Sequence, residues 1–204
     1  MIGSRIPNSP DANTLSGTSV HFASNFASGL GGAIASLDGR VSLRGAIFVD
    51  NRAEQRGGAI NAEWGMRMDS TVLGSSLIVR NEAPIAGGYI GSRLELINTT
   101  VADNRGGGIR MTTVESNVPS PHPGELRLKN SILLNNEGGN CPPAADHSIV
   151  IDLGNNIQFP GSECGTTIQS VDPLLDSMYV PHPLSPARQA GDNETCRRRC
   201  RFRH

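Results

Sequence analysis

The sequence has few aromatic residues, little net charge and no long hydrophobic run. Aromatic residues make up 4% of the 204 residues, which is too few for a core built on large rings. The formal net charge is −1, from 18 basic and 19 acidic residues, so the chain has no overall basic field for nucleic acid. No stretch is apolar for the length of a membrane-spanning helix. We therefore predict neither a nucleic-acid partner nor a transmembrane segment.

Cysteine is absent from the first 140 residues and is confined to Cys141, Cys164, Cys196 and Cys200. This late clustering favours disulfides that close an irregular end in an oxidising compartment, although four cysteines allow three pairings. A zinc site that combines Cys141, Cys164 and His147 is the alternative, but the spacings match no compact ligand pair. We predict disulfides, and neither a metal nor another cofactor.

The sequence is rich in glycine, with 24 residues, and it repeats. An Asn closes a short apolar segment in each copy, and these residues are Asn25, Asn51, Asn81, Asn104 and Asn136. A Gly-Gly step follows the first four copies and leads to Ile34, Ile60, Ile90 and Ile109. Short apolar segments that recur in this way are typical of a solenoid, in which each coil stacks on the next.

Counting back from each Asn predicts which side chains face the interior. Three residues before it stand Phe22, Phe48, Ile78, Val101 and Leu133. Eight residues before it stand Gly17 and then Leu43, Leu73, Leu96 and Leu128. With the Ile residues after the Gly-Gly steps, these positions form three apolar columns on separate short strands. We predict an all-β fold, a right-handed parallel β-helix of about five coils with an irregular C-terminal cap.

The repeat divides the chain into four parts. Residues 1–14 are expected to form a poorly ordered N-terminal segment and residues 15–140 the coils. Residues 141–196 are expected to hold a C-terminal coil and loops with a disulfide. Residues 197–204 form an arginine-rich tail, and we interpret it as a solvated end rather than a nucleic-acid or lipid contact.

The Asn column and its charged neighbours have predicted structural roles. Stacked Asn amides can bond from coil to coil in a ladder, and Asn tolerates the left-handed backbone of a tight turn. One position before the Asn, Asp50, Arg80 and Asp103 alternate in sign, and the position after it alternates through Arg52, Glu82, Arg105 and Glu137. We predict two ion-pair ladders that flank the Asn ladder and specify its register.

Two sets of motifs resemble known families. Phe22 to Asn25 with Gly31 to Ile34, and Phe48 to Asn51 with Gly57 to Ile60, resemble the repeats of chlamydial polymorphic outer-membrane proteins. The whole of residues 15–196 is similar to right-handed β-helices of the pectate-lyase-like group. Its C-terminal part resembles the bacterial choice-of-anchor Q domain in the segments Lys129 to Asn136, Gly139 to Cys141, Gly154 to Asn156, Val171 to Leu175, Leu184 to Ala187 and Ala190 to Cys196.

The resemblance implies a secreted or surface-attached protein in which Cys141 pairs with Cys164. Two features depart from the family pattern. The segment after Leu175 is short, and the chain shows neither an export signal nor a long upstream array of coils. We therefore expect the chain to be part of a longer protein.

Two functional classes remain open from the sequence. The first is a non-enzymatic module, a spacer or adhesin that contacts surface or matrix polysaccharide or protein. The second is a polysaccharide lyase or glycoside hydrolase, with Asp50, Arg80 and Asp103 as candidate catalytic residues and Ca²⁺ as an accompanying ion. The alternating charges of these three residues favour structural pairing over catalysis. Trp64 and Tyr89 are further candidates, as exposed rings that could stack on sugars.

Overall fold

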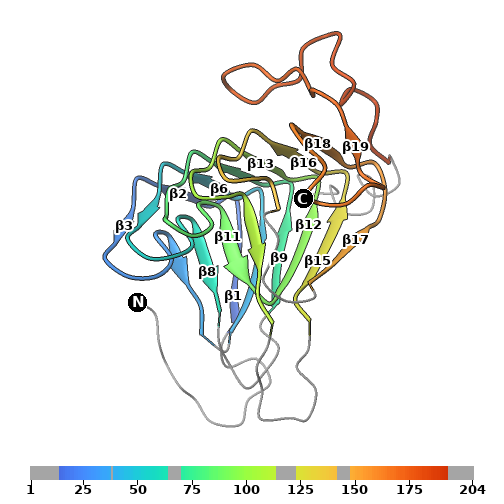
Figure 1. The fold of residues 1–204 in the computed structure, drawn as a ribbon. Coiled ribbons are helices and arrows are strands. Elements are labelled where there is room, and N and C mark those ends of the chain that lie inside the picture. Colours follow the sequence, from blue (N-terminus) through green and yellow to red (C-terminus); the bar gives the residue numbers. More distant parts are fainter. Residues whose placement is uncertain (1–13, 38, 64–69, 114–122, 142–147, 193–204) are drawn as a thin grey trace.

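The structure, a computed structural model, describes residues 14–37, 39–63, 70–113, 123–141 and 148–192. These residues form strands and turns with no helix among them, and the predicted fold is confirmed as a parallel β-solenoid of about five turns (Figure 1). No helix in the described ranges is long and apolar enough to cross a membrane. The arginine-rich tail, Trp64, His147, Cys196 and Cys200 lie outside these ranges.

Three parallel sheets extend along the solenoid. The six-stranded sheet contains, in order, β1 (Thr14–Thr18), β5 (Arg40–Arg44), β9 (Ser70–Gly74), β12 (Arg93–Ile97), β15 (Glu125–Lys129) and β17 (Ile149–Asp152). The seven-stranded sheet contains β2 (His21–Ala23), β6 (Ile47–Val49), β10 (Leu77–Val79), β13 (Thr100–Ala102), β16 (Ile132–Leu134), β18 (Ile157–Phe159) and β19 (Gln169–Ser170). The four-stranded sheet contains β4 (Ile34–Ala35), β8 (Ile60–Ala62), β11 (Tyr89–Gly91) and β14 (Ile109–Met111), and β3 (Phe26–Ala27) pairs with β7 (Arg52–Ala53).

The apolar columns fill the space between the sheets. In the six-stranded sheet Leu43 lies between Gly17 and Leu73, and in the seven-stranded sheet Phe48 lies between Phe22 and Ile78. The rings of Phe22 and Phe48 stack with their centroids 4.8 Å apart. Each fully buried Leu, Ile or Phe contributes about 1.5–3 kcal/mol through its removal from water, so the stacked columns supply the main stabilisation of the fold.

The third column differs from the prediction in one coil. Tyr89 pairs with Ile60 and Ile109, whereas Ile90 pairs with Asn61 and Arg110, so Tyr89 takes the inward position predicted for Ile90. The turn between Asn81 and this strand is one residue shorter than in the two preceding coils, which shifts the register and exchanges the two faces of the strand. Tyr89 is fully buried, so the expectation of an exposed, sugar-stacking ring is wrong.

The left-handed backbone lies one position before the ladder Asn, not at the Asn itself as predicted. The residues in this conformation are Ser24, Asp50, Arg80, Asp103 and Asn135, with φ between 50° and 55°. A second corner repeats the conformation at Ser19, Gly45, Ser75, Asn98, Asn130 and Asn155. In the Gly-Gly steps a positive φ occurs at Gly31 and Gly57 and at both Gly106 and Gly107, and Ala86 adopts it in the third, shorter turn. Each left-handed residue at the first corner turns the chain so that the following Asn points into the interior.

The predicted asparagine ladder is confirmed, and it extends one residue further. Asn51 Nδ2 donates to Asn81 Oδ1 at 2.9 Å, and Asn81 Nδ2 donates to Asn104 Oδ1 at 3.0 Å. The same pattern joins Asn25 to Asn51 and Asn104 to Asn136, and Asn136 continues it to Asn140 at 2.8 Å. The backbone N–H of each donor Asn also donates to the same oxygen. The buried amides therefore hold neighbouring coils in register.

A second buried polar column, which the repeat pattern does not predict, lies at the other corner. Ser76, Thr99, Ser131 and Asn156 each accept a hydrogen bond from the backbone N–H of the preceding coil, with N···O distances from 2.8 to 3.4 Å. Its members differ in type, so no single letter marks the column in the sequence. Because both corners carry such bonds, each coil is fastened to its neighbour on two sides.

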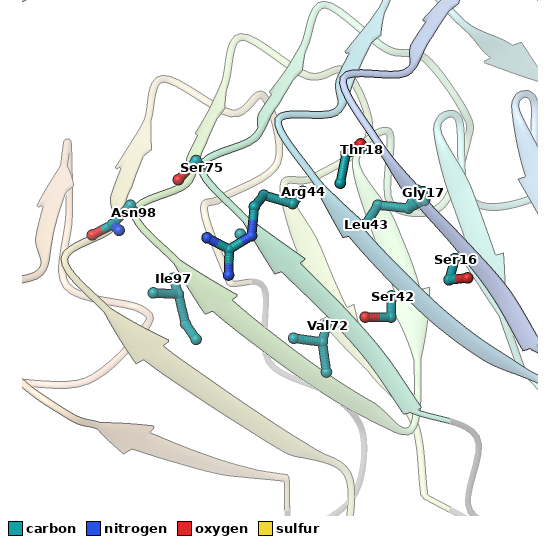
Figure 2. A pocket seen from close by; sticks show the side chains of 11 residues that line it. Ser16, Gly17, Thr18, Ser42, Leu43, Arg44, Val72, Ser75, Ile97 and Asn98 are labelled. Atoms are coloured by element: carbon teal, nitrogen blue, oxygen red, sulfur yellow. The ribbon is translucent and has the colours of Figure 1, made fainter. Parts of the chain in front are cut away.

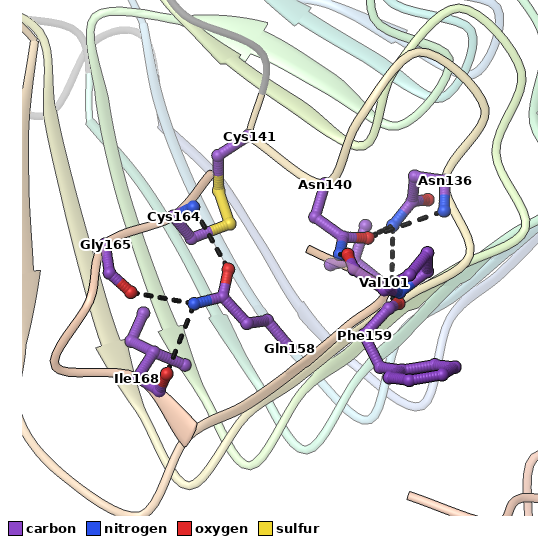
Figure 3. Close-up of a disulfide and its surroundings, with 10 residues drawn as sticks. Val101, Asn136, Asn140, Cys141, Gln158, Phe159, Cys164, Gly165 and Ile168 are labelled. Carbon is purple, nitrogen blue, oxygen red and sulfur yellow. Dashed lines mark hydrogen bonds between the residues drawn. A yellow bond between two sulfur atoms is a disulfide. The ribbon is translucent and has the colours of Figure 1, made fainter. Parts of the chain in front are cut away.

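The C-terminal end of the solenoid is closed by polar and covalent contacts (Figure 3). Cys141 and Cys164 form a disulfide. In the last coil, fully buried Gln158 pairs with Leu133 and so continues its column. Its Nε2 donates to the carbonyl of Gly165 at 2.8 Å, and its Oε1 accepts from the N–H of Cys164 at 3.1 Å. The apolar column therefore ends on a side chain whose amide is satisfied on both its nitrogen and its oxygen.

Candidate functional site

The three predicted catalytic residues lie on the corner beside the asparagine ladder, and their side chains are on the outer surface of the solenoid. Arg80 makes a bidentate ion pair with Asp50, with Nε···Oδ1 and Nη2···Oδ2 distances of 2.9 and 3.0 Å. Asp103 instead accepts a hydrogen bond from the hydroxyl of Tyr179 at 2.8 Å. The predicted Arg80–Asp103 ion pair does not form, since the C-terminal segment brings Tyr179 to that position.

The electrostatics of this cluster hold Arg80 and Tyr179 in their ordinary charge states. Hydrogen bonds to Asp50 and Tyr179 raise the pKa of Arg80 above its ordinary value. Burial and the hydrogen bond to Asp103 raise the pKa of Tyr179 to about 12. A guanidinium held this firmly in its charged form does not accept a proton near neutral pH, so the contacts of Arg80 are those of a structural ion pair.

The second predicted ladder forms across its whole length, with looser geometry. Arg52 Nε lies 3.9 Å from Glu82 Oε1, Arg105 Nη1 lies 3.6 Å from Glu82 Oε2, and Arg105 Nε lies 4.0 Å from Glu137 Oε2. All four side chains are well exposed. Exposed pairs of this kind contribute about 0–1 kcal/mol each, so they favour one register without dominating stability.

The outward face of the six-stranded sheet presents a different set of side chains. An open pocket of about 470 Å³ lies on this face over β1, β5, β9 and the corner that follows β12. Hydroxyl and amide groups from Ser16, Thr18, Ser42, Ser75 and Asn98 line it, together with apolar Val72 and Ile97. Figure 2 shows the guanidinium of Arg44 projecting from β5 into the middle of this group. The face thus combines hydrogen-bonding groups with a positive charge.

Two arginines give the first part of this face its charge. Arg40 and Arg44 point outward from the two ends of β5, with outward Ser42 between them and inward Val41 and Leu43 buried. Neither guanidinium forms an ion pair with another described residue. Strands β1, β5 and β9 contain no Asp or Glu, so the positive charge here is not neutralised within these three strands.

The face changes character further along the sheet. From β12 onward acidic residues appear, and Glu125 lies 4.0 Å from Arg93 and 3.4 Å from Arg127. The unpaired arginines of β5 are therefore confined to the first three strands of the sheet. We call the outward side of β1, β5 and β9 the basic face.

The basic face has no distinctive pattern in the sequence. Arg40 and Arg44 alternate with buried Val41 and Leu43, and this alternation is the usual one for a half-exposed strand. What distinguishes them is the absence of acidic partners on the two flanking strands, which depends on the register of distant segments. Among the described residues, no group of three or more His, Cys, Asp or Glu side chains is arranged to hold a metal ion.

No protein-family model matches the chain, and comparisons with curated proteins and with solved structures return no match. The fold is therefore established from the structure alone, and functional assignment depends on the chemistry of the described surfaces.

Proposed function

We propose that this chain is a non-enzymatic module of a secreted or cell-surface protein, in which a rigid β-solenoid presents an adhesive surface for acidic polysaccharide. The observation that carries the proposal is the pair of guanidinium groups of Arg40 and Arg44, which lie among outward hydroxyl groups and form no ion pair with another residue in the described part of the chain. Carboxylate and sulfate groups of a polysaccharide would pair with the arginines, and its hydroxyl groups would bond to Ser16 and Ser42.

Two further features support an extracellular module. The Cys141–Cys164 disulfide is of a kind that persists in oxidising compartments. The Phe-x-x-Asn and Gly-Gly-Ala-Ile motifs resemble repeats of surface-exposed bacterial β-helices. The candidate catalytic residues support a structural role instead of an enzymatic one, because Arg80 is fully paired with Asp50 and Asp103 is bonded to Tyr179.

Binding and cleavage should be measured together to test the proposal. We expect the protein to bind polygalacturonate and dextran sulfate but not neutral dextran, and affinity should fall as salt rises. Arg40→Gln and Arg44→Gln should each weaken binding severalfold, since each removes one charge contact worth about 1 kcal/mol. Arg105→Gln is the matched control, because Arg105 is exposed, as Arg40 is, but already paired on another corner.

The same experiment separates the proposal from the enzymatic alternative. Equal binding by the parent and both β5 variants would exclude the basic face as the binding site. Release of shortened or unsaturated uronate products, abolished by Asp50→Ala or Asp103→Ala, would establish the lyase or hydrolase function instead.

A further inference from the structure

The open pocket on the basic face has a notch in its floor at Gly74. Gly74 is the outward residue at the end of β9, and its neighbours in the same row of the sheet are Arg44 on β5 and Ile97 on β12. A Cβ placed on Gly74 would meet no atom within 4 Å, and its φ lies outside the left-handed region. The backbone therefore does not require glycine here, and the missing side chain leaves part of the space that the pocket occupies.

The guanidinium of Arg44 lies at this notch. Figure 2 shows it extended from β5 toward β9, among Val72, Ile97, Ser75 and Asn98. It forms no ion pair with another described residue. Its N–H donors are therefore available to a ligand that enters the pocket.

The side-chain amide of Asn98 adds a second donor at the same pocket. Asn98 Oδ1 accepts from Asn130 Nδ2 at 2.9 Å, and Asn130 Oδ1 accepts from Asn155 Nδ2 at 3.2 Å. The three amides form a relay along the corner, and Asn98 is the member that lines the pocket. Hydrogen bonds in such a chain polarise one another, so Asn98 Nδ2, which donates to no described residue, is a strengthened donor.

The groups around the notch match an anion better than a cation. The guanidinium of Arg44 and the amide of Asn98 supply donors, and half-buried Val72 supplies an apolar surface for a sugar ring. Glu95, an outward carboxylate of β12, pairs in register with Val72 one outward position before the notch and does not line the pocket. A bound anion would therefore lie at the corner end of the strands, beyond Glu95.

We propose that the Gly74 notch is a subsite for the oxyanion of one acidic sugar unit, a carboxylate or a sulfate ester, held by Arg44 and Asn98 Nδ2. This inference rests on the proposed polysaccharide function and narrows it. Arg44 fixes the position of the polymer, whereas Arg40, at the opposite end of β5, contributes long-range attraction. Gly74 determines specificity, because a side chain at this position would occupy the space of the bound group.

Replacing Asn98 by Asp tests the amide donor. Asn98→Asp keeps the shape of the side chain, the acceptor for Asn130 and the tolerance of left-handed backbone. It should bind polygalacturonate about tenfold more weakly than the parent, because a hydrogen bond to a charged group is lost and a like charge is introduced. Asn135→Asp is the matched control and should bind as the parent does, since Asn135 is exposed, has a φ of 50° and lies on the other corner.

Replacing Gly74 by Val tests the notch without removing any donor. Gly74→Val should weaken binding as strongly as Asn98→Asp does, while the midpoint of thermal unfolding stays the same or rises, because a β-branched residue favours a strand. A purely structural role of Gly74 would not separate affinity from stability in this way. Gly29→Val is the matched control, because it also adds a side chain into open space, in the turn after β3. It should leave binding unchanged.

Dextran sulfate distinguishes the two oxyanions. Losses of equal size for both polymers would show that the subsite accepts either group, whereas a loss confined to polygalacturonate or to dextran sulfate would assign it to carboxylates or to sulfate esters. Unchanged binding of both polymers by Asn98→Asp and Gly74→Val would overturn the subsite, and the proposed function would stand if Arg40→Gln still weakened binding. If the parent bound neither polymer, the proposed function and the subsite would both be wrong.

Discussion

The hydroxyl of Tyr179 donates a hydrogen bond to Oδ2 of Asp103 across a sequence separation of 76 residues. Leu175 and Tyr179 also pack against a small apolar cluster on the outward side of the seven-stranded sheet, formed by Val79, Ala102 and Leu134. The C-terminal segment is thus fastened to the middle of the solenoid by one polar and one apolar contact. The hydrogen bond from Tyr179 explains why Asp103 does not form the predicted ion pair with Arg80.

Replacing Tyr179 by Phe should loosen this segment without unfolding the coils. The variant keeps the ring and loses the hydrogen bond, so cleavage between residues 171 and 192 by a protease at low concentration should become faster.

The stabilisation that the Tyr179 hydroxyl provides should depend on pH. The pKa of Tyr179 rises from 10 to about 12 on folding, so the hydroxyl stabilises the fold below pH 10, and this contribution disappears as the pH rises through 12. The free energies of unfolding of the parent and the variant should therefore converge between these pH values. A difference that stays constant with pH would contradict the hydrogen bond between Tyr179 and Asp103.

The stacking of the coils could be predicted because the residues that face inward recur at fixed offsets from Asn. Phe48, Ile78 and Val101 are vertical neighbours as their common position before the Asn predicts. The failure at Ile90 has a simple cause. A turn shortened by one residue reverses the faces of a strand, and neither Tyr89 nor Ile90 is polar enough to reveal which one points inward.

The contacts that close the ends and corners could not be predicted in the same way. The mixed column of Ser76, Thr99 and Ser131 has no constant residue type, because a hydroxyl or an amide can accept the same backbone hydrogen bond. Tyr179 lies outside the repeat, so no offset relates it to Asp103. The basic face depends on an absence of acidic residues on neighbouring strands, which becomes visible only when the register is known.

The Asp50–Arg80 pair predicts an unequal response to charge reversal. Arg80→Asp should lower the free energy of unfolding by about 1 kcal/mol, because an exposed ion pair is lost and like charges become neighbours. Adding Asp50→Arg should recover most of the loss, whereas adding Asp103→Arg should recover less, since that change also removes the acceptor for Tyr179. Urea denaturation of the two double variants measures the difference. Equal recovery would mean that both carboxylates interact with Arg80 to the same extent.

The second corner offers a stabilising substitution. Ser75 has a φ of 50° in a column where the next coils carry Asn98 and Asn130, and these two amides bond to each other at 2.9 Å. Ser75→Asn should stabilise the protein by about 0.5–1 kcal/mol, since Asn tolerates left-handed backbone better and its Oδ1 can accept from the Nδ2 of Asn98 in the next coil, as Asn98 accepts from Asn130. Ser75→Val is the control and should be destabilising, because a β-branched side chain is strained at this φ. Thermal denaturation should rank Asn above Ser and Ser above Val.

The disulfide should contribute to stability mainly at the C-terminal end. It joins Cys141 and Cys164, which are 23 residues apart, and a closed loop of this size is worth about 3 kcal/mol. The double variant Cys141→Ser, Cys164→Ser should lose about this amount in urea denaturation. Adding a reductant should destabilise the parent by a similar amount and leave the double variant unchanged. A reductant effect of equal size in both proteins would assign the stabilisation to other cysteines.

The interior of the asparagine ladder should be far more sensitive to substitution than Asn25 in its first described coil. Asn81 accepts hydrogen bonds from the backbone and the amide of Asn51 and donates to Asn104, all within the fully buried core. Asn81→Leu removes the acceptor for the backbone N–H and one Nδ2 hydrogen of Asn51, and the donor to Asn104 Oδ1 and to the carbonyl of Phe48, so it should cost about 4 kcal/mol of stability. Asn25→Leu removes one hydrogen bond, from Nδ2 to Asn51 Oδ1, at an exposed position and should cost about 1 kcal/mol. Urea denaturation of both variants tests the ladder as a register device, because similar losses at the two sites would show that the buried amides contribute no more than the exposed one.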